Sequence, residues 1–599
     1  MSTQETAEHT IDRPRPGRDA PPRLSDYDVE RASFNLQVPQ RYNPVLHIVE
    51  PWAAEDPGAP AVLSLDGTGE IVQLDTAASL ARASREAARA LLELGIGPGD
   101  HVFVMLPRIP AWYAAMLGCI RIGAVPMPGP NLLTPKDIAY RVERARAKAA
   151  ITDAAGAAKT DAATTGLKAR LCVGRDAPLG WLNFEECCAA AGDGPTPEDP
   201  THSDDPLLLY FTSGTVAYPK MVQHRQSYGL GHVGTARFWH DLRAGDVHWT
   251  ITDTGWAKAA WGTLFGQWHE RACVIQATLG PPDADTIFRI IERHGITSFC
   301  APPTLYRLLV LRDFTRYDFS TLRHCTSAGE PLNPEVIRAW REGTGGLTVY
   351  DGYGQTETTA LVANYRTVEV RPGSMGRPVP GWDVAVVDDD GAPLGAGDVG
   401  HVVVRRDPEP VGLFPGYHED PDATAAAFRG PWYFTGDKAS IDADGWFWFE
   451  GRSDDVITSS AYRIGPFEVE SALVEHPAVA EAAVVGKDDP QRTQIVVAFC
   501  VLAPGHAASD ELAKTLQDHV KLVTAPYKYP REVYFVDELP KTVSGKIRRT
   551  ELRGRLRENR PEAPSVLRRR PHTVVRQGAG STEPALMGHA SPPLESLLR

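Results

Sequence analysis

A short apolar run in this chain leads directly into a polar loop that ends in a lysine. The run is Leu207 to Phe211, and the loop reads Thr212-Ser213-Gly214-Thr215-Val216-Ala217-Tyr218-Pro219-Lys220. Small residues let backbone N–H groups approach an anion, hydroxyls donate further hydrogen bonds, and a lysine supplies a mobile ammonium for phosphate oxygens. The loop is not a Walker A loop, because Pro219 precedes the lysine and no Ser or Thr follows it. Taken alone, it fits a phosphate site or a polar surface loop almost equally well.

Around this segment, amphipathic helical patterns alternate with short apolar runs. Residues Leu80 to Leu94 follow a helical period and end at Gly95, and the strand-like run His101 to Leu106 comes next. Another strand-like run, His401 to Val404, lies between Gly- and Pro-rich connections. The alternation predicts an α/β fold with a large multi-layer N-terminal body, in a chain whose 599 residues are too many for one simple domain.

The pattern changes near residues 451–455. Helices are expected over Phe467–Leu473 and Leu512–Val523, and strands over Val479–Val485, Ile495–Leu502 and Glu532–Val536. About 100 residues of this kind predict a small α+β C-terminal cap domain. The Pro-rich ends of the chain cannot offset their ordering entropy. The expected organisation is an unstructured lead over 1–30, a body over 31–452, a cap over 455–555 and an unstructured tail over 560–599.

The charge balance argues against a polyanion-binding surface. The chain has 62 Lys and Arg against 76 Asp and Glu, a net charge of −14. No bulk attraction to nucleic acid or an anionic membrane is therefore expected, and any polyanionic ligand must be held by local donors. The arginine cluster from Arg553 to Arg570 is interpreted as a solvated arm rather than a nucleic-acid site.

The cysteines and the N-terminus bear on location. Eight cysteines without a C-x-x-C pair favour reduced thiols, and no apolar stretch approaches the roughly 18 residues of a membrane span. The first twenty residues lack an apolar signal core and include Glu5, Glu8, Asp12 and Asp19, whereas a mitochondrial transit peptide is poor in acids. A cytoplasmic location is expected.

Two G-x-G-x-x-G matches suggest a dinucleotide site, at Gly229-Gly231-Gly234 and Gly395-Gly397-Gly400. The fingerprint requires a buried strand before the loop and a helix after it. Neither context is evident in the sequence, so both matches are interpreted as turns.

Five further strings follow the Lys220 loop in one order. They are Tyr353-Gly354-Gln355-Thr356-Glu357, Tyr433-Phe434-Thr435-Gly436-Asp437, Gly451-Arg452-Ser453-Asp454-Asp455, Tyr462-Arg463-Ile464-Gly465-Pro466-Phe467-Glu468-Val469-Glu470 and Pro540-Lys541-Thr542-Val543-Ser544-Gly545-Lys546. Glu357, near groups that can donate hydrogen bonds to phosphate, offers a hard oxygen ligand of the kind that Mg²⁺ prefers.

In this order the strings resemble the acyl-adenylate-forming superfamily of acyl-CoA synthetases, adenylation domains and luciferases. The chain is most similar to the medium-chain acyl-CoA synthetases, over about residues 35–555. The strings nearest to that branch are Asp253–Trp261, Ser327–Glu335 and Tyr462–Glu470.

The resemblance implies an ATP- and Mg²⁺-dependent carboxylic acid:CoA ligase acting through an acyl-AMP intermediate, with CoA as co-substrate and a medium-chain fatty or aryl acid as substrate. It implies that Lys546, Lys220, Thr215 and Glu357 are catalytic, and that Thr215 and Glu357 help to hold Mg²⁺. The implied ATP- and AMP-binding residues are Thr212, Ser213, Gly214, Thr215, Lys220, Gly329, Glu330, Pro331, Asp351, Gly352, Tyr353, Gly354, Gln355, Thr356, Asp437, Arg452 and Lys546.

The resemblance also implies a two-pose enzyme. Asp454 falls at the hinge about which the AMP-binding cap swings, and Ala461, Tyr462 and Arg463 face the CoA side. Trp256, Trp261 and Gly354 are expected at the acyl pocket, although both indoles fit a purely structural role about equally well. Gly354 stands where relatives restricted to acetate have Trp, which implies a deeper pocket.

Two departures from the family pattern bear on the second half-reaction. Ala217 and Ala461 stand where relatives commonly carry Gly. An extra methyl beside the CoA channel keeps one alternative open, an adenylating enzyme that transfers the acyl group to a carrier protein. A catalytically inactive nucleotide-binding homologue is a second alternative, against which Lys220, Glu357, Asp437 and Lys546 argue.

Overall fold

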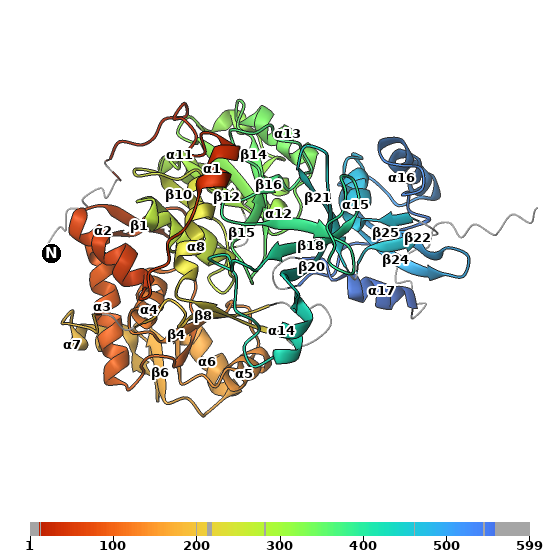
Figure 1. Cartoon of the computed structure of the whole chain (residues 1–599). Helices are drawn as coiled ribbons and strands as arrows, with labels where there is room; N and C mark the ends of the chain where they lie inside the picture. The colour runs from red at the N-terminus through yellow and green to blue at the C-terminus, as the bar shows by residue number, and fades with distance from the viewer. Residues whose placement is uncertain are drawn as a thin grey trace, which may run out of the picture.

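The computed structural model describes residue 11 and residues 13–198, 201–212, 219–280, 283–453, 455–459, 462–542 and 546–557. Three larger sheets and a hairpin form the N-terminal body, and a fourth large sheet forms a separate C-terminal unit (Figure 1). The predicted α/β fold with a small α+β cap is confirmed.

The central sheet has nine strands in the order β16-β15-β14-β13-β12-β10-β11-β1-β2. Strands β1, β10, β11, β12, β13 and β14 run parallel, and β2, β15 and β16 are antiparallel to their neighbours. The bounds are β1 Pro60–Leu65, β2 Ile71–Thr76, β10 Val247–Thr250, β11 Cys273–Ala277, β12 Ser298–Ala301, β13 His324–Ala328, β14 Val349–Gly354, β15 Ala360–Ala363 and β16 Arg377–Pro378. Ligands of such sheets commonly bind beyond the carboxyl ends of the parallel strands.

A second, parallel sheet has the order β4-β3-β5-β6-β7, and a hairpin of β8 and β9 lies beside it. A third, antiparallel sheet joins β17, β18, β20, β19 and β21. The bounds are β3 His101–Met105, β4 Val125–Pro128, β5 Ala149–Asp153, β6 Ala169–Val173, β7 Leu182–Asn183, β8 Pro206–Phe211, β9 Met221–Arg225, β17 Val384–Val387, β18 Gly400–Arg405, β19 Phe428–Arg429, β20 Trp432–Ile441 and β21 Phe447–Arg452.

Helices pack between and around these sheets. In α3 the expected start and stop signals operate: Thr76 accepts a hydrogen bond from the Ser79 N–H, Leu80 and Leu91 are buried, and Gly95 takes a φ of +69° just beyond the end. The body helices are α1 Tyr27–Ser33, η1 Val45–Val49, α2 Glu50–Glu55, α3 Ala77–Glu93, α4 Pro110–Arg121, α5 Pro135–Arg144, α6 Ala154–Ala163, α7 Phe184–Ala191, α8 Tyr228–Gly234, η2 Thr235–Trp239, α9 Lys258–Thr263, α10 Gly266–His269, α11 Ala284–Arg293, α12 Pro303–Leu309, η3 Phe314–Arg316, α13 Pro334–Gly343 and α14 Pro421–Ala427.

The C-terminal unit lies at one end of the body, in blue in Figure 1. Its sheet has the order β23-β22-β25-β24, with β26 parallel to β25. The bounds are β22 Ile457–Ser459, β23 Tyr462–Ile464, α15 Pro466–Val474, β24 Val479–Asp489, β25 Thr493–Leu502, α16 Asp510–Val523, β26 Glu532–Phe535 and α17 Arg549–Arg557. All five elements expected in this part of the sequence are present.

The prediction of an unstructured lead is wrong for residues 13–30, because polar contacts with the body hold these residues in place. Arg15 donates from Nη1 to the Gly295 carbonyl at 3.1 Å, and Arg18 donates from Nη2 to the Thr344 carbonyl at 2.7 Å. The segment ends in α1, where the Tyr27 hydroxyl donates to the Pro378 carbonyl at 2.8 Å. Composition alone does not reveal such long-range partners.

The structure corrects two further interpretations. The first glycine-rich match lies within α8, which follows β9, so its glycines are helical and do not form the expected turn, whereas Gly397 does form a turn. In the arginine cluster, Arg553 lies on α17 and pairs with Asp455 at 2.6 Å instead of belonging to a solvated arm.

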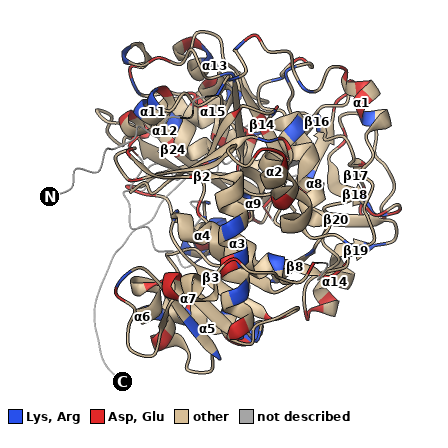
Figure 2. Cartoon of the chain, turned by 90° about the vertical axis from the view of Figure 1, so that its left-hand side faces the viewer, with Lys and Arg blue, Asp and Glu red and all other residues tan. Residues whose placement is uncertain are grey.

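The surface carries both signs of charge. Figure 2 shows basic and acidic positions interspersed over the helices of one face, including α3 and α5. All eight cysteines lie in the described part of the chain and are free thiols. Among the described helices, none combines the length and apolar character needed to cross a bilayer.

Candidate active site

Thr212 and Lys220 adjoin the facing ends of β8 and β9, which form a hairpin. The Thr212 N–H donates to the Lys220 carbonyl at 3.0 Å, and the Lys220 N–H donates to Thr212 Oγ1 at 3.3 Å. The strand expected over Leu207–Phe211 is confirmed as β8, and every residue from Leu207 to Phe211 is buried. Ser213, Gly214, Thr215 and Ala217 lie outside the described residues, so the structure adds nothing about the loop itself.

Lys220 is part of a connected group with Tyr417 and Glu357. The Lys220 ammonium lies 4.4 Å from the centre of the Tyr417 ring, and the Tyr417 hydroxyl donates to Glu357 Oε1 at 2.9 Å. Burial raises the pKa of Glu357, while the Tyr417 hydrogen bond and the charges of Arg452 and Lys220 oppose this. Nothing in the sequence had singled out Tyr417, because its chain position is 60 residues from Glu357.

His224 supports the same group from β9. Its Nε2 lies 2.7 Å from the Thr356 carbonyl, which can only accept, so Nε2 carries the proton. Burial lowers the pKa of His224 to about 4, so the ring is neutral at physiological pH. His224 therefore fixes the backbone next to Glu357 without adding charge.

Asp437 and Arg452 face each other across β20 and β21. The two residues are register partners, and Arg452 Nε lies 3.5 Å from Asp437 Oδ1. Tyr353 Oη and Gln355 Nε2 each donate to Asp437 Oδ2 at 2.7 Å. Burial raises the pKa of Asp437, and the positive charges of Arg452 and Lys546 oppose the rise. Asp437 and Arg452, both expected to bind the nucleotide, are thus brought together with two residues of the Tyr353 string.

Lys546 reaches this group from the C-terminal unit. The Thr542 N–H donates to the Lys546 carbonyl at 2.7 Å, which closes a turn, and the exposed Lys546 side chain acts electrostatically on both Asp437 and Lys258. Asn333 Nδ2 donates to Ser471 Oγ at 3.0 Å and joins the body to α15. Val543, Ser544 and Gly545 lie outside the described residues.

The segment Gly329 to Pro331, expected to bind the nucleotide, is held between Lys258 and Asp351. Gly329 has a φ of +112°, a conformation that favours glycine. Lys258 Nζ donates to the Ala328 carbonyl at 2.9 Å, and Asp351 accepts from the Leu332 N–H at 3.3 Å. Glu330 pairs with Arg307 at 3.2 Å. Lys258 was not predicted as a site residue, although it stands in the Asp253–Trp261 string.

Asp351 should make the unliganded protein less stable as the pH rises. Burial raises its pKa from 3.8 to about 8, so the folded state holds a proton that the unfolded state loses between these values. The unfolding free energy therefore falls with rising pH in this window. Asp351→Asn cannot ionise, so its unfolding free energy relative to wild type should increase from pH 5 to pH 8 in urea denaturation. A constant difference would contradict the protonated assignment.

The predicted acyl-pocket residues are only partly adjacent. Trp261 is buried and contacts Gly354, whereas Trp256 is half-buried on the preceding turn. A β-carbon at position 354 would lie 2.5 Å from Trp261 Cη2, so the indole packs directly against Gly354. The deeper pocket expected from Gly354 stays a prediction.

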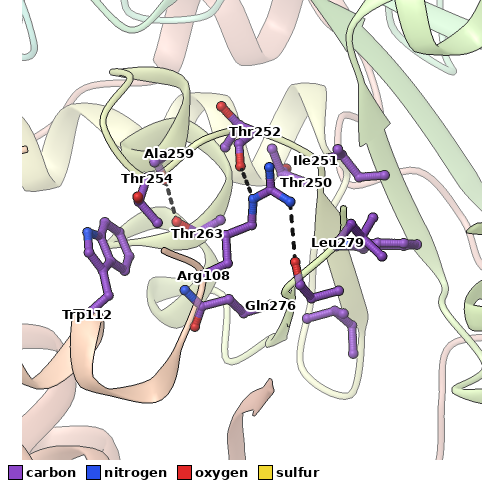
Figure 3. A pocket seen from close by; sticks show the side chains of 13 residues that line it. Arg108, Trp112, Thr250, Ile251, Thr252, Thr254, Ala259, Thr263, Gln276 and Leu279 are labelled. Atoms are coloured by element: carbon purple, nitrogen blue, oxygen red, sulfur yellow. Dashed lines mark hydrogen bonds between the residues drawn. The ribbon is translucent and has the colours of Figure 1, made fainter. Parts of the chain in front are cut away.

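A small cavity lies beside the face of α9 that carries Ala259 and Thr263 (Figure 3). It measures about 20 Å³, room for one water, and is lined by Arg108, Trp112, Thr250, Ala259 and Thr263 among others. Arg108 donates to the carbonyls of Thr252 at 2.7 Å and Ala277 at 3.3 Å. None of the predicted site residues lines this cavity.

On the expected CoA side, Tyr462 and Arg463 lie in β23, paired with Ser459 and Thr458 of β22. Ala461 and the expected hinge residue Asp454 lie outside the described residues. Next to the hinge position, Asp455 pairs with Arg549 at 3.6 Å, and Arg549 also pairs with Glu470 at 2.8 Å.

Comparison with known proteins identifies the class. The sequence matches the AMP-binding enzyme family over residues 49–418 and the AMP-binding enzyme C-terminal domain over residues 468–546. The chain belongs to the AMP-binding enzymes.

Its relatives narrow the class to acyl-CoA synthetases. The chain is 45% identical to mouse mitochondrial acyl-coenzyme A synthetase ACSM3 over 89% of its length and 94% of the relative. It is 46% identical to human mitochondrial acyl-coenzyme A synthetase ACSM5 over 86% of its length and 91% of the relative. Among solved structures, the anthranilate CoA ligase AuaEII in complex with anthranoyl-AMP has a TM-score of 0.79 at 30% identity, over 86% of this chain and 98% of that chain.

These findings confirm the resemblance to the adenylate-forming medium-chain acyl-CoA synthetases. They overturn the cytoplasmic location expected from the acidic N-terminus, because the curated relatives are named as mitochondrial enzymes. The carrier-directed alternative gains no support from them.

Proposed function

We propose that the chain is an ATP- and Mg²⁺-dependent carboxylic acid:CoA ligase that forms an acyl-AMP intermediate. The observation that carries the proposal is the meeting of three groups from distant parts of the chain: Lys220 with Glu357, Asp437 with Arg452, and Lys546 from the cap. These are the cations and carboxylates that a bound nucleoside triphosphate requires. Local groups must supply them, because the net charge of the protein is −14.

In the first half-reaction a substrate carboxylate oxygen forms a bond to the α-phosphorus of ATP, and the bond to the pyrophosphate oxygen breaks. An anion thus attacks a polyanion, so the barrier is largely electrostatic. Lys546 would stabilise charge at the α-phosphate, and Lys220 with the loop from Thr212 would hold the β- and γ-phosphates. Asp437 would accept hydrogen bonds from the ribose hydroxyls.

The residues present fit a magnesium ion. No group of three or more His, Cys, Asp or Glu side chains in the described ranges could hold a metal by itself. Mg²⁺ typically binds through one or two carboxylates together with substrate phosphates, and the Glu357 carboxylate suits this use. When bound, Mg²⁺ neutralises phosphate charge; Glu357, together with Thr215, would hold it.

In the second half-reaction the CoA thiolate attacks the acyl carbonyl carbon, a thioester forms, and AMP leaves with its phosphate oxygen. This step needs CoA beside the acyl-AMP, on the side assigned to Ala461, Tyr462 and Arg463. A swing of the cap about Asp454 would withdraw Lys546 and present these residues.

One assay tests the proposal. The enzyme is incubated with ATP, Mg²⁺ and medium-chain and aryl acids, with and without CoA, and pyrophosphate and thioester are followed. Both products should form with at least one acid. Pyrophosphate without thioester would favour a different acyl acceptor, and no pyrophosphate with any acid would refute the ligase function.

Glu357→Gln should lower kcat/KM for ATP about 100-fold and raise the Mg²⁺ concentration needed for half-maximal pyrophosphate release. The amide keeps the size and can still accept from Tyr417, but it removes the negative charge. Glu335→Gln is the matched control, since that exposed carboxylate pairs with Arg338 on α13. An unchanged Mg²⁺ dependence in Glu357→Gln would exclude Glu357 as a ligand.

A further inference from the structure

One short segment of the body, residues 414–419, is bonded through its backbone to two separate parts of the candidate site. The Phe414 N–H donates to the Glu357 carbonyl at 3.0 Å, and the His418 N–H donates to the Met221 carbonyl at 2.8 Å. Met221 is the first residue of β9, at the end of the hairpin where the site lysine lies. The segment therefore bridges the carboxylate and the lysine of the site, which come from distant parts of the chain.

Tyr417, in the middle of this segment, contacts both site residues with different parts of one side chain. Its hydroxyl donates to Glu357 Oε1 at 2.9 Å, and the Lys220 ammonium lies 4.4 Å from the centre of its ring. A hydrogen bond to an ionised carboxylate is strong and directional, and an aromatic face attracts a cation. One side chain thus holds an anion and a cation of the site in a defined relation to each other.

The backbone that carries Tyr417 is itself anchored. The Tyr417 N–H donates to Thr424 Oγ1 of α14 at 2.9 Å, and Glu419 pairs with Arg144 at 3.3 Å and with Arg146 at 2.6 Å. Glu419 has a φ of +53°, and a residue with a side chain keeps such a conformation only where the surrounding contacts over-determine it. The ring and hydroxyl of Tyr417 are therefore presented from a firmly held backbone.

We infer that Tyr417 is a positioning residue that aligns Glu357 and Lys220 before ATP binds. The inference rests on the proposed function, in which Glu357 meets Mg²⁺ and Lys220 meets the β- and γ-phosphates of the same nucleotide. Groups that are aligned in advance lose less conformational freedom when the ligand binds. The hydroxyl acts on the carboxylate and hence through Mg²⁺, whereas the ring acts on the ammonium and hence on ATP directly, so the two contributions are separable.

The test is the Kd of ATP, measured by isothermal titration calorimetry without any acid, in buffer with Mg²⁺ and in buffer with EDTA. Tyr417→Phe removes only the hydroxyl, so it should raise the Kd about fivefold with Mg²⁺ and leave it unchanged in EDTA. Tyr417→Leu also removes the ring, so it should raise the Kd in EDTA as well, by about threefold. In the complete reaction, both variants should need more Mg²⁺ for half-maximal pyrophosphate release.

Tyr317→Phe is the matched control, because it removes another hydroxyl that donates to a carboxylate, that of Asp285, at 2.6 Å. Tyr317 follows η3, apart from the residues assigned to the nucleotide, and its variant should leave both Kd values unchanged.

Three results would overturn the inference: wild-type Kd values in both Tyr417 variants, an equal rise in the two buffers for Tyr417→Phe, or a lower Kd in Tyr417→Leu. The last result would mean that the ring holds Lys220 away from the nucleotide. A wild type that binds no ATP in either buffer would instead refute the proposed function.

Discussion

Lys546→Ala should reduce acyl-AMP formation by about 10²- to 10³-fold while leaving thioester formation from supplied acyl-AMP nearly unchanged. The ammonium acts on developing phosphate charge, which exists only in the first half-reaction, and such groups are worth a few kcal/mol in the transition state. Its charge reaches Asp437 in the arrangement described, which is the nucleotide side of the site. The measurement is pyrophosphate release with ATP and acid, beside thioester release with synthetic acyl-AMP and CoA.

Lys541→Ala is the matched control for this prediction. Lys541 belongs to the same string, is similarly exposed, and pairs with Glu481 of the cap at 2.7 Å instead of approaching the nucleotide groups. It should change both half-reactions less than twofold, as expected for a surface ion pair. Equal losses of both half-reactions in Lys546→Ala would contradict the assignment of Lys546 to adenylation alone.

The sequence predicted the elements whose signals are local. The helix at residues 77–93 has an N-cap at Thr76, an apolar stripe and a glycine at position 95 just beyond its end, and two strands of the C-terminal domain each contain an apolar run. Residues 13–30 were predicted wrongly because their order comes from partners more than 200 residues away, such as Gly295 for Arg15. Long-range polar contacts leave no periodic trace in a segment.

The residues of the candidate site also fall into those that a local motif predicts and those that only the fold brings together. Motif strings located Lys220, Glu357, Asp437 and Lys546, which the structure gathers into one region. Tyr417 and His224 were missed, since each matters only because folding places it against Glu357 or Thr356. The deeper pocket inferred from Gly354 stays a prediction, because a motif records the missing side chain and not the Trp261 indole that packs against it.

The docked N-terminal segment rests on a buried charge cluster that should be the most sensitive point for stability. Asp241 accepts from the Arg23 N–H at 2.6 Å and from Arg366 at 2.9 Å, and it also pairs with Arg323. Arg323 bonds Asp246 as well, at 2.8 Å, and its side chain is completely buried. Arg366 in turn donates to the Ala20 carbonyl at 3.0 Å, so the cluster links the N-terminal segment to the central sheet.

Arg323→Met should therefore destabilise the protein by about 3–5 kcal/mol, because it leaves two buried carboxylates short of their main cation. The urea midpoint should fall, and limited proteolysis should cut residues 13–30 faster than in wild type. Arg338→Met is the matched control, because it makes the same substitution in an exposed ion pair on α13. It should lower the unfolding free energy by less than about 1 kcal/mol. If both variants lose the same stability, the buried cluster contributes no more than a surface pair, and the N-terminal segment must be held by its other contacts.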